Sequence, residues 1–386
     1  MPKFTRGEFL GLSALLVGGL RWRPTEILRA QSAKPSVEPD LVVINARVLT
    51  MDDRVPKADA LAVKDGRFVG VGSTLDIRNL ATRRTRVIDA AKMTVTPGFI
   101  DTHCHPSGVN ELYGVDLDLR SIADIQAALR KKAAQTKPGY WVTGFKFDDT
   151  KLREGRPLHR KDLDTAVPDH PVAVNHRGGH TSWYNSKAFE LAKVTKDTPD
   201  PRGGRFERGA DGELTGKVAE LARSVFGRVG LRDQLTPEQV RERNRAGMRH
   251  MSGLLTAAGL TTVHDAGAGQ ERIVAYEDVF HSGELRHRAY IMISRGLLDA
   301  FKRTGVYTGF GNEWVRIGGV KYAADGSASE RTMRMSTPYV GKDDYGILTM
   351  TQEEIHDAVE DAHRHNFQVG IHANGDITID MVLNAY

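Results

Sequence analysis

The pattern of apolar and polar positions predicts short strands in the first part of the chain. Between residues 40 and 89, apolar and β-branched residues gather in runs at 41–50, 60–64, 67–72 and 85–89. Asp65 and Gly66 separate the second run from the third, and this dipeptide favours a tight hairpin because the turn needs positive φ at both positions. We therefore predict a small N-terminal β-sandwich over residues 39–95, without catalytic residues.

Beyond residue 95 the pattern changes to strands that alternate with helices. Apolar runs predict strands at 95–105, 261–266, 287–294, 315–324 and 367–372, and amphipathic stretches predict helices at 122–134, 237–257 and 351–365. Thr351 and Glu354 form a capping box at the start of the last helix. This alternation is typical of β/α units around a parallel sheet, so the predicted fold class is α/β. An insertion at about 106–255, rich in Gly, Pro and charge, is expected to form loops and short elements over a barrel mouth.

Residues 1–33 have the pattern of an export segment. Lys3 and Arg6 precede an apolar run at 9–20, which is too short to span a membrane but suits a signal peptide. The stretch resembles a twin-arginine signal with Gly7 at the second arginine position, and residues 30–33 offer a weak cleavage zone. We expect export, to a bacterial periplasm, through this or a general signal. The alternative is a cytoplasmic protein with a disordered or surface-packed extension.

Composition narrows the classes of function. Lys and Arg number 54 against 49 Asp and Glu, a net charge of +5, which does not indicate a nucleic-acid partner. Hydrophobic residues at 40% and charged residues at 27% argue against disorder and against an integral membrane domain, apart from an uncleaved signal. The single cysteine, Cys104, excludes an intramolecular disulfide and a cysteine-based zinc knuckle. Any metal must be held by histidines, carboxylates or a modified lysine.

One motif carries most of the chemistry. In the sequence Pro97-Gly98-Phe99-Ile100-Asp101-Thr102-His103-Cys104-His105, the two histidines stand two residues apart on a predicted strand. They therefore project from the same face, while Cys104 points to the other face as a small core residue. Two imidazoles at the end of a strand suit a divalent cation. An isolated His-x-His is as often structural or exposed.

This motif, after a small β-layer, resembles the amidohydrolase superfamily of metal-dependent hydrolases. Further stretches are similar to family 3, the branch that contains N-substituted formamide deformylase; these are Gly179-His180 with Asn185, and residues 199–204, 212–216, 259–267, 321–327 and 371–376. The similarity runs from about residue 40 to the last residue. It implies a (β/α)8 TIM barrel over 96–386, of which about five strands are present.

The resemblance also implies a metal site. The family holds one or two divalent cations, usually Zn²⁺, with His-x-His on strand 1, a carboxylated lysine on strand 4, histidines on strands 5 and 6, and an Asp on strand 8. This assigns His103, His105, Lys321 and His372 as ligands. A neutral, desolvated amine can add CO2 and become an anionic oxygen ligand, which an ammonium cannot. From the residues alone, Lys321 is favoured as a strand-end lysine that reaches solvent, and only the resemblance makes it a ligand. For His372 the alternative is a buried, hydrogen-bonded histidine, and the ligand is favoured.

Five further residues are weaker candidates for roles in the site. His180 and Arg331 are candidates for substrate binding, and His264, Asp325 and Asp376 for contacts behind the ligands. Backbone hydrogen bonds, helix capping and salt bridges explain them equally well.

The resemblance predicts a function, but only about five of the eight strands of a complete barrel are present in this sequence. The strand 6 His and the strand 8 Asp, the expected general base, would lie beyond Tyr386, so we expect a fragment or a truncated product. The intact protein is expected to hydrolyse non-peptide C–N bonds of small-molecule amides or formamides with metal-activated water. Alternatives are a cyclic amide or ester hydrolase and a catalytically inactive metal-binding remnant. The sequence leaves the oligomeric state open, a homo-oligomer included.

Overall fold

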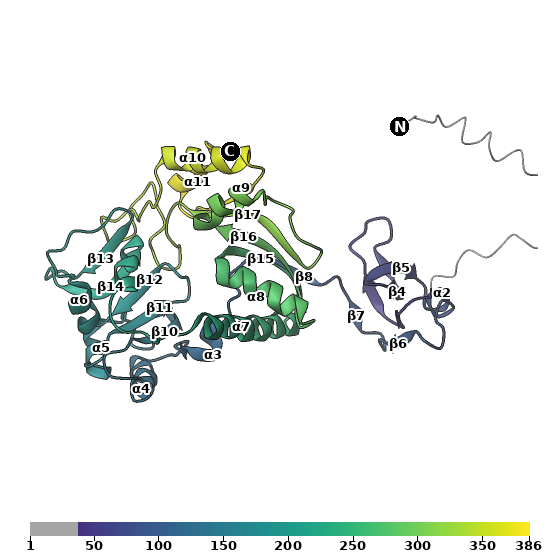
Figure 1. Ribbon diagram of the computed structural model, residues 1–386, viewed down its shortest axis with the longest axis horizontal. Helices are drawn as coiled ribbons and strands as arrows, with labels where there is room; N and C mark the ends of the chain where they lie inside the picture. Colours follow the sequence, from purple (N-terminus) through teal and green to yellow (C-terminus); the bar gives the residue numbers. More distant parts are fainter. Residues whose placement is uncertain (1–37) are drawn as a thin grey trace, which may run out of the picture. The chain divides into compact units, whose positions relative to one another are not determined.

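The computed structural model of the chain describes residues 38–386 (Figure 1). These residues divide into two compact units, the first ending at Pro97 and the second running from Gly98 to Tyr386. The export segment expected at residues 1–33 lies outside the described residues. Among the described helices, none has both the length and the apolar character needed to cross a membrane.

Two small sheets and a short helix make up the first unit. The strand orders are β5-β4-β1-β6 and β3-β2-β7. The elements are β1 (Leu41–Ile44), β2 (Arg47–Leu49), β3 (Lys57–Ala58), β4 (Ala60–Lys64), β5 (Arg67–Gly72), α2 (Thr74–Arg78), β6 (Arg86–Asp89) and β7 (Thr94–Val95). β4 and β5 form the predicted hairpin, with φ of 49° at Asp65 and 74° at Gly66. Buried Val42, Ile44 and Ile77 pack together between β1 and α2.

The single strand predicted at 41–50 is wrong. The chain turns at Asn45, whose φ is 52°, so β1 and β2 enter different sheets. The Asn45 side chain stabilises this turn by donating to Asp89 Oδ2 at 2.8 Å, and its backbone N–H donates to Thr74 Oγ1 at 3.0 Å. Asn tolerates the left-handed conformation better than the β-branched residues around it.

A curled parallel sheet of five strands organises the second unit. Its order is β18-β17-β16-β15-β8, and each neighbouring pair is parallel. The strands are β8 (Phe99–Cys104), β15 (Leu260–Ala268), β16 (Arg288–Ser294), β17 (Val315–Ala323) and β18 (Gln368–His372). All five were predicted from their apolar runs, which confirms the mixed α/β class. The first is shorter than predicted, because Val95 belongs to β7.

Helices follow these strands and cover the sheet. They are α7 (Pro237–Ala257), α8 (Gln270–His281), η4 (Arg295–Leu297), α9 (Leu298–Thr304), α10 (Gln352–Arg364) and α11 (Asp376–Leu383). The predicted capping box of Thr351 and Glu354 is confirmed at the start of α10, and Thr236 and Gln239 form another at α7.

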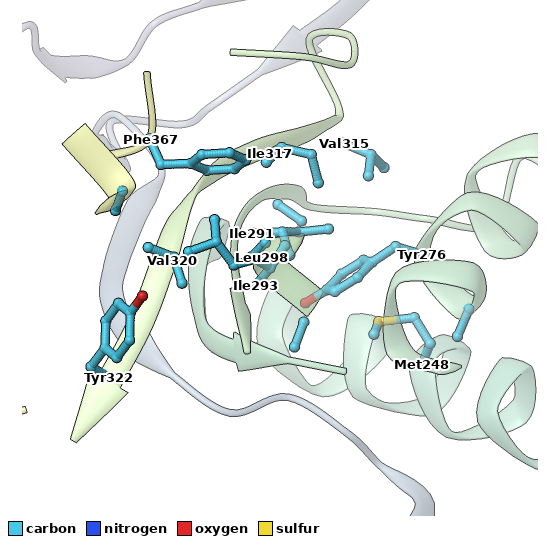
Figure 2. Packing of buried hydrophobic residues seen from close by; sticks show 14 of the residues in the cluster. Met248, Tyr276, Ile291, Ile293, Leu298, Val315, Ile317, Val320, Tyr322 and Phe367 are labelled. Atoms are coloured by element: carbon cyan, nitrogen blue, oxygen red, sulfur yellow. The ribbon is translucent and has the colours of Figure 1, made fainter. Parts of the chain in front are cut away.

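The largest apolar core lies between the sheet and these helices. Figure 2 shows Ile291 and Ile293 of β16 beside Val320 of β17, with Tyr276 of α8 on the helical side. Each of these residues is completely buried. Burial of such side chains stabilises the fold by roughly 1.5–3 kcal/mol each, so this core fixes the strand ends on which the candidate ligands stand.

The expectation of loops and short elements for the insertion at 106–255 is wrong. It forms a mixed six-stranded sheet, β13-β14-β12-β11-β10-β9, with its own helices (Figure 1). The elements are α3 (Val109–Tyr113), β9 (Val115–Asp116), α4 (Ile122–Ala133), β10 (Val142–Phe147), η2 (Asp149–Lys151), α5 (Arg160–Ala166), β11 (Val172–His176), β12 (Thr181–Tyr184), α6 (Ser186–Ala192), β13 (Gly204–Arg208), β14 (Leu214–Glu220) and η3 (Leu221–Arg228). Two apolar clusters, around Phe147 with Trp183 and around Phe206 with Phe226, stabilise this sheet.

Candidate metal centre

The end of β8 presents the two histidines of the His-x-His motif. The ring centroids of His103 and His105 are 5.5 Å apart, with the ring planes at 76°. The Cys104 thiol lies next to β15, 3.6 Å from the carbonyl oxygen of His264, and burial raises the pKa of Cys104 to about 12. The cysteine is therefore a neutral packing residue here and not a thiolate ligand.

The turn after His105 is held by a close contact with α7. Gly108 has φ of 71°, and a Cβ added there would lie 2.0 Å from the carbonyl oxygen of Gly247. A Cβ on Gly247 would in turn lie 2.7 Å from the carbonyl oxygen of Ser107. Two glycines are needed for this approach, and the contact fixes the segment that immediately follows the histidines.

Lys321 reaches the same place from β17. Its Nζ lies 3.3 Å from His103 Nε2, and its neighbours in register are Ser294 of β16 and Gly370 of β18. Burial lowers the pKa of Lys321, because the desolvated ammonium is disfavoured relative to the amine. The neutral amine is the form that coordinates a cation or adds CO2.

His372 stands at the end of β18, where a backbone hydrogen bond determines its tautomer. Its Nε2 lies 2.8 Å from the carbonyl oxygen of Gly326. A carbonyl only accepts, so Nε2 carries the proton and Nδ1 keeps the lone pair that a metal needs. The His372 ring stacks on that of His180, with centroids 4.7 Å apart.

All four predicted ligands line one cavity of about 620 Å³, and His180 lines it too. Burial lowers the pKa of His103 and His372, and burial together with the nearby His103 lowers that of His105 to about 4. The imidazoles are therefore neutral, which is the protonation state that binds a divalent cation. The chemistry of this donor set fits the implied metal.

Sequence analysis missed Glu220, which orients His180. The Glu220 Oε2 atom lies 2.8 Å from His180 Nδ1, and its Oε1 accepts from the Thr332 hydroxyl at 2.8 Å. Because a carboxylate accepts, the Nδ1 atom of His180 carries the proton of this hydrogen bond. Glu220 has φ of 51° and ψ of −130°, a strained conformation for a residue with a side chain. The end of β14 gives no sequence signal for this role.

The remaining predicted residues occupy different surroundings. Asp325 is buried and accepts from the backbone N–H groups of Arg334, Asn374 and Gly375, and its Oδ1 lies 3.8 Å from His372 Nε2. Asp376 accepts from Ser336, and Arg331 donates to Asp149. His264 stacks on the Tyr290 ring, with centroids 4.6 Å apart. Of these residues, the structure brings only Asp325 next to a candidate ligand.

A second group of possible ligands lies in the insertion. The ligand atoms of Asp148, Asp149 and His176 all lie within 4.8 Å of one another. Asp148 already pairs with Arg177 at 2.6 Å, and Asp149 with Arg331 at 3.1 Å. His176 itself lies 3.4 Å from Asp149 and 3.4 Å from Glu330. The two carboxylates raise its pKa to about 9 against the opposing effect of burial, which favours an ion-pair network over a cation site.

Comparison with known proteins gives consistent similarities. The model of a family described as "Amidohydrolase family" matches residues 86–386. N-substituted formamide deformylase of Arthrobacter pascens is 28% identical over 90% of this chain and 65% of its own length. The putative amidohydrolase YtcJ of Bacillus subtilis is 26% identical over 88% of this chain and 64% of its own. The chain thus spans a little less than two thirds of these relatives.

A solved structure has the same fold. The crystal structure of an uncharacterized metal-dependent hydrolase from Pyrococcus furiosus matches with a TM-score of 0.62 and 27% identity. The match covers 89% of this chain and 69% of that one.

Proposed function

Because this chain belongs to the amidohydrolase family, we propose that it carries the metal site of a hydrolase that cleaves non-peptide C–N bonds, of amide or formamide type, in small molecules. The observation that supports this most is the convergence of His103, His105, Lys321 and His372 on one cavity. The similarity to a protein named N-substituted formamide deformylase favours formamides. We further propose that the five-stranded sheet is part of a (β/α)8 barrel, whose strand ends carry such sites.

The residues of the cavity suggest how the site works. We propose that the four residues would hold one or two divalent cations, zinc above all, with Lys321 contributing as a carbamate. A bound cation would supply a water of lowered pKa and polarise the scissile carbonyl. His180, oriented by Glu220, lines the cavity and would contact the substrate there. Arg272 also lines this cavity, and its Nη1 atom donates a hydrogen bond to Asp265 Oδ1 at 2.7 Å.

Replacement of Lys321 tests this proposal. Lys321→Ala would remove the proposed carbamate ligand, so metal content after dialysis and kcat/KM on N-substituted formamides should both fall, the latter about 100-fold. Added short carboxylic acids should restore part of the rate, because they can occupy the vacated space. Lys321→Arg should not restore it, since a guanidinium cannot form a carbamate.

Lys342→Ala, at an exposed lysine outside the cavity lining, is the matched control and should keep full metal content and activity. Metal-free protein that hydrolyses formamides at an undiminished rate would contradict the proposal.

We also propose that residues 1–33 direct export. Mass spectrometry of the protein from its own host should show these residues removed, and cell fractionation should place it outside the cytoplasm. Cytoplasmic protein that begins at Met1 or Pro2 would contradict this.

A further inference from the structure

The charges that line the candidate metal cavity are strongly unbalanced. Among its lining residues there is one carboxylate, Glu220, against five basic side chains, Arg177, Arg223, Arg272, Arg295 and Lys321. The proposed carbamate would remove the charge of Lys321. The four arginines stay charged at any physiological pH, so the question is which of them have partners within the protein.

Two of the arginines are neutralised by carboxylates outside the cavity lining. Arg177 Nε lies 2.6 Å from Asp148 Oδ2, and Arg272 lies 2.7 Å from the completely buried Asp265. Among residues 38–386, Glu220 forms no ion pair with either of the other two arginines; its oxygens contact His180 and Thr332.

Arg223, from η3, has no carboxylate partner within residues 38–386. Its contact with the Ser182 hydroxyl is long, at 3.5 Å, and its Nε is buried without a hydrogen-bond partner. Arg160 and Arg245 also have an unpaired Nε, but each holds a glutamate through another nitrogen atom. A half-buried guanidinium without an anion is costly, and such a group calls for a ligand.

Arg295, from η4 after β16, is the second unpaired cation. In the part of the chain that the structure describes, its side chain makes no hydrogen bond and no ion pair with a carboxylate. Arg295 is exposed and lines the cavity, as do Tyr322 and Thr349, and it also lines a second pocket that contains Glu354, Asp357 and Asp361. Arg223 belongs to the insertion and Arg295 to the parallel-sheet part, so the two guanidinium groups reach the same cavity from different elements.

We propose that Arg223 and Arg295 bind a carboxylate of the substrate. This inference rests on the proposed function and refines it, because the substrates would be amides or formamides that carry a carboxylate, such as N-formyl or N-acyl amino acids. Guanidinium groups match a carboxylate in charge and hydrogen-bond geometry, and such charge-assisted contacts are strong in a partly buried site. Neutral formamides would leave both arginines without an anion.

Matched ligands that differ only in charge test this. Binding of N-formylglycine, N-formyl-β-alanine and N-formyl-4-aminobutyrate to the zinc-loaded chain is measured by calorimetry, each against its carboxamide. The three chain lengths sample the distance between the formyl group and the arginines. At the best length the carboxylate should bind about 10-fold or more tightly than the amide, as expected for a hydrogen bond between charged groups. Added salt should reduce this preference.

Arg223→Gln and Arg295→Gln should each lower the preference for the carboxylate over the amide, and the double variant should abolish this preference. Arg303→Gln, an exposed arginine on α9 outside the cavity, is the control and should keep the preference. Equal binding of acid and amide at every length, or a preference that survives the double variant, would overturn the inference. Formamide hydrolysis without any carboxylate preference would leave the proposed function intact and reject only this refinement.

Discussion

At the scale of single residues, His176 links burial to a pH-dependent stability. It is buried between Asp149 and Glu330, and its pKa is raised to about 9. The backbone N–H of Gly178 also points at Nδ1, at 3.1 Å, which favours the neutral ring, but two carboxylates outweigh one amide dipole. Because the folded pKa exceeds the ordinary 6.5, the imidazolium contributes full stability below pH 6.5. That contribution is lost as the pH rises through about 9.

We therefore predict that the free energy of unfolding falls by the order of 1–3 kcal/mol between pH 6.5 and 9.5. Urea denaturation at several pH values measures this. His176→Asn should be less stable and lack this slope, while His281→Asn, at an exposed site on α8, should keep it. A slope that persists in His176→Asn would contradict the assignment. A slope that EDTA removes would indicate a cation at Asp148, Asp149 and His176 instead of an ion-pair network.

At the scale of elements, helix α7 contains two glycines whose replacement by alanine is expected to change the stability of the protein in opposite directions. A Cβ on Gly253 meets nothing within 4 Å, whereas one on Gly247 would lie 2.7 Å from Ser107 O and 2.8 Å from Val109 N. Gly253→Ala should stabilise the protein by roughly 0.5–1 kcal/mol through helix propensity. Gly247→Ala should destabilise it, because the backbone after His105 must move.

Thermal denaturation of the two variants measures the difference, and each glycine serves as the control for the other. Gly247→Ala should also lower zinc content, since the displaced segment adjoins His105. Equal melting temperatures for the two variants would show that the contact between α7 and this segment does not restrain the fold.

The same elements show what the sequence could and could not predict. The five parallel strands were predicted from their apolar runs, and α10 from its amphipathic pattern and the cap at Thr351. Each of these signals is contained in a short stretch of sequence, so it can be recognised without knowledge of the fold. The insertion was missed because its strands are short and separated by glycines and charges, and its cores form only when they pair. The network of His176 with Glu330 joins residues far apart in sequence, and Glu220 acquires its role from a strained turn at the end of β14. Tertiary contacts, which no local pattern encodes, determine both.

At the scale of the whole molecule, the candidate ligands come from the two outer strands of the parallel sheet and a strand beside one of them. His103 stands on β8, at one edge, and His372 on β18, at the other, with Lys321 on the neighbouring β17. A cation held by all three would connect β8 with β17 and β18, two strands with which β8 does not pair. Metal binding should therefore be coupled to the stability of the whole sheet, because the unfolded chain cannot bring these residues together.

This coupling predicts that zinc raises the melting temperature in a concentration-dependent way. At a free zinc concentration about 100 times Kd, the stabilisation should reach about 2.7 kcal/mol, which corresponds to several degrees for a chain of this size. Differential scanning fluorimetry over a zinc series, started from protein treated with a chelator, measures the shift. The double variant His103→Asn, His372→Asn removes a ligand from each edge strand and should lose the shift, whereas His281→Asn should retain it. A melting temperature that does not depend on zinc in the unmodified chain would mean that the two edges of the sheet do not share a cation.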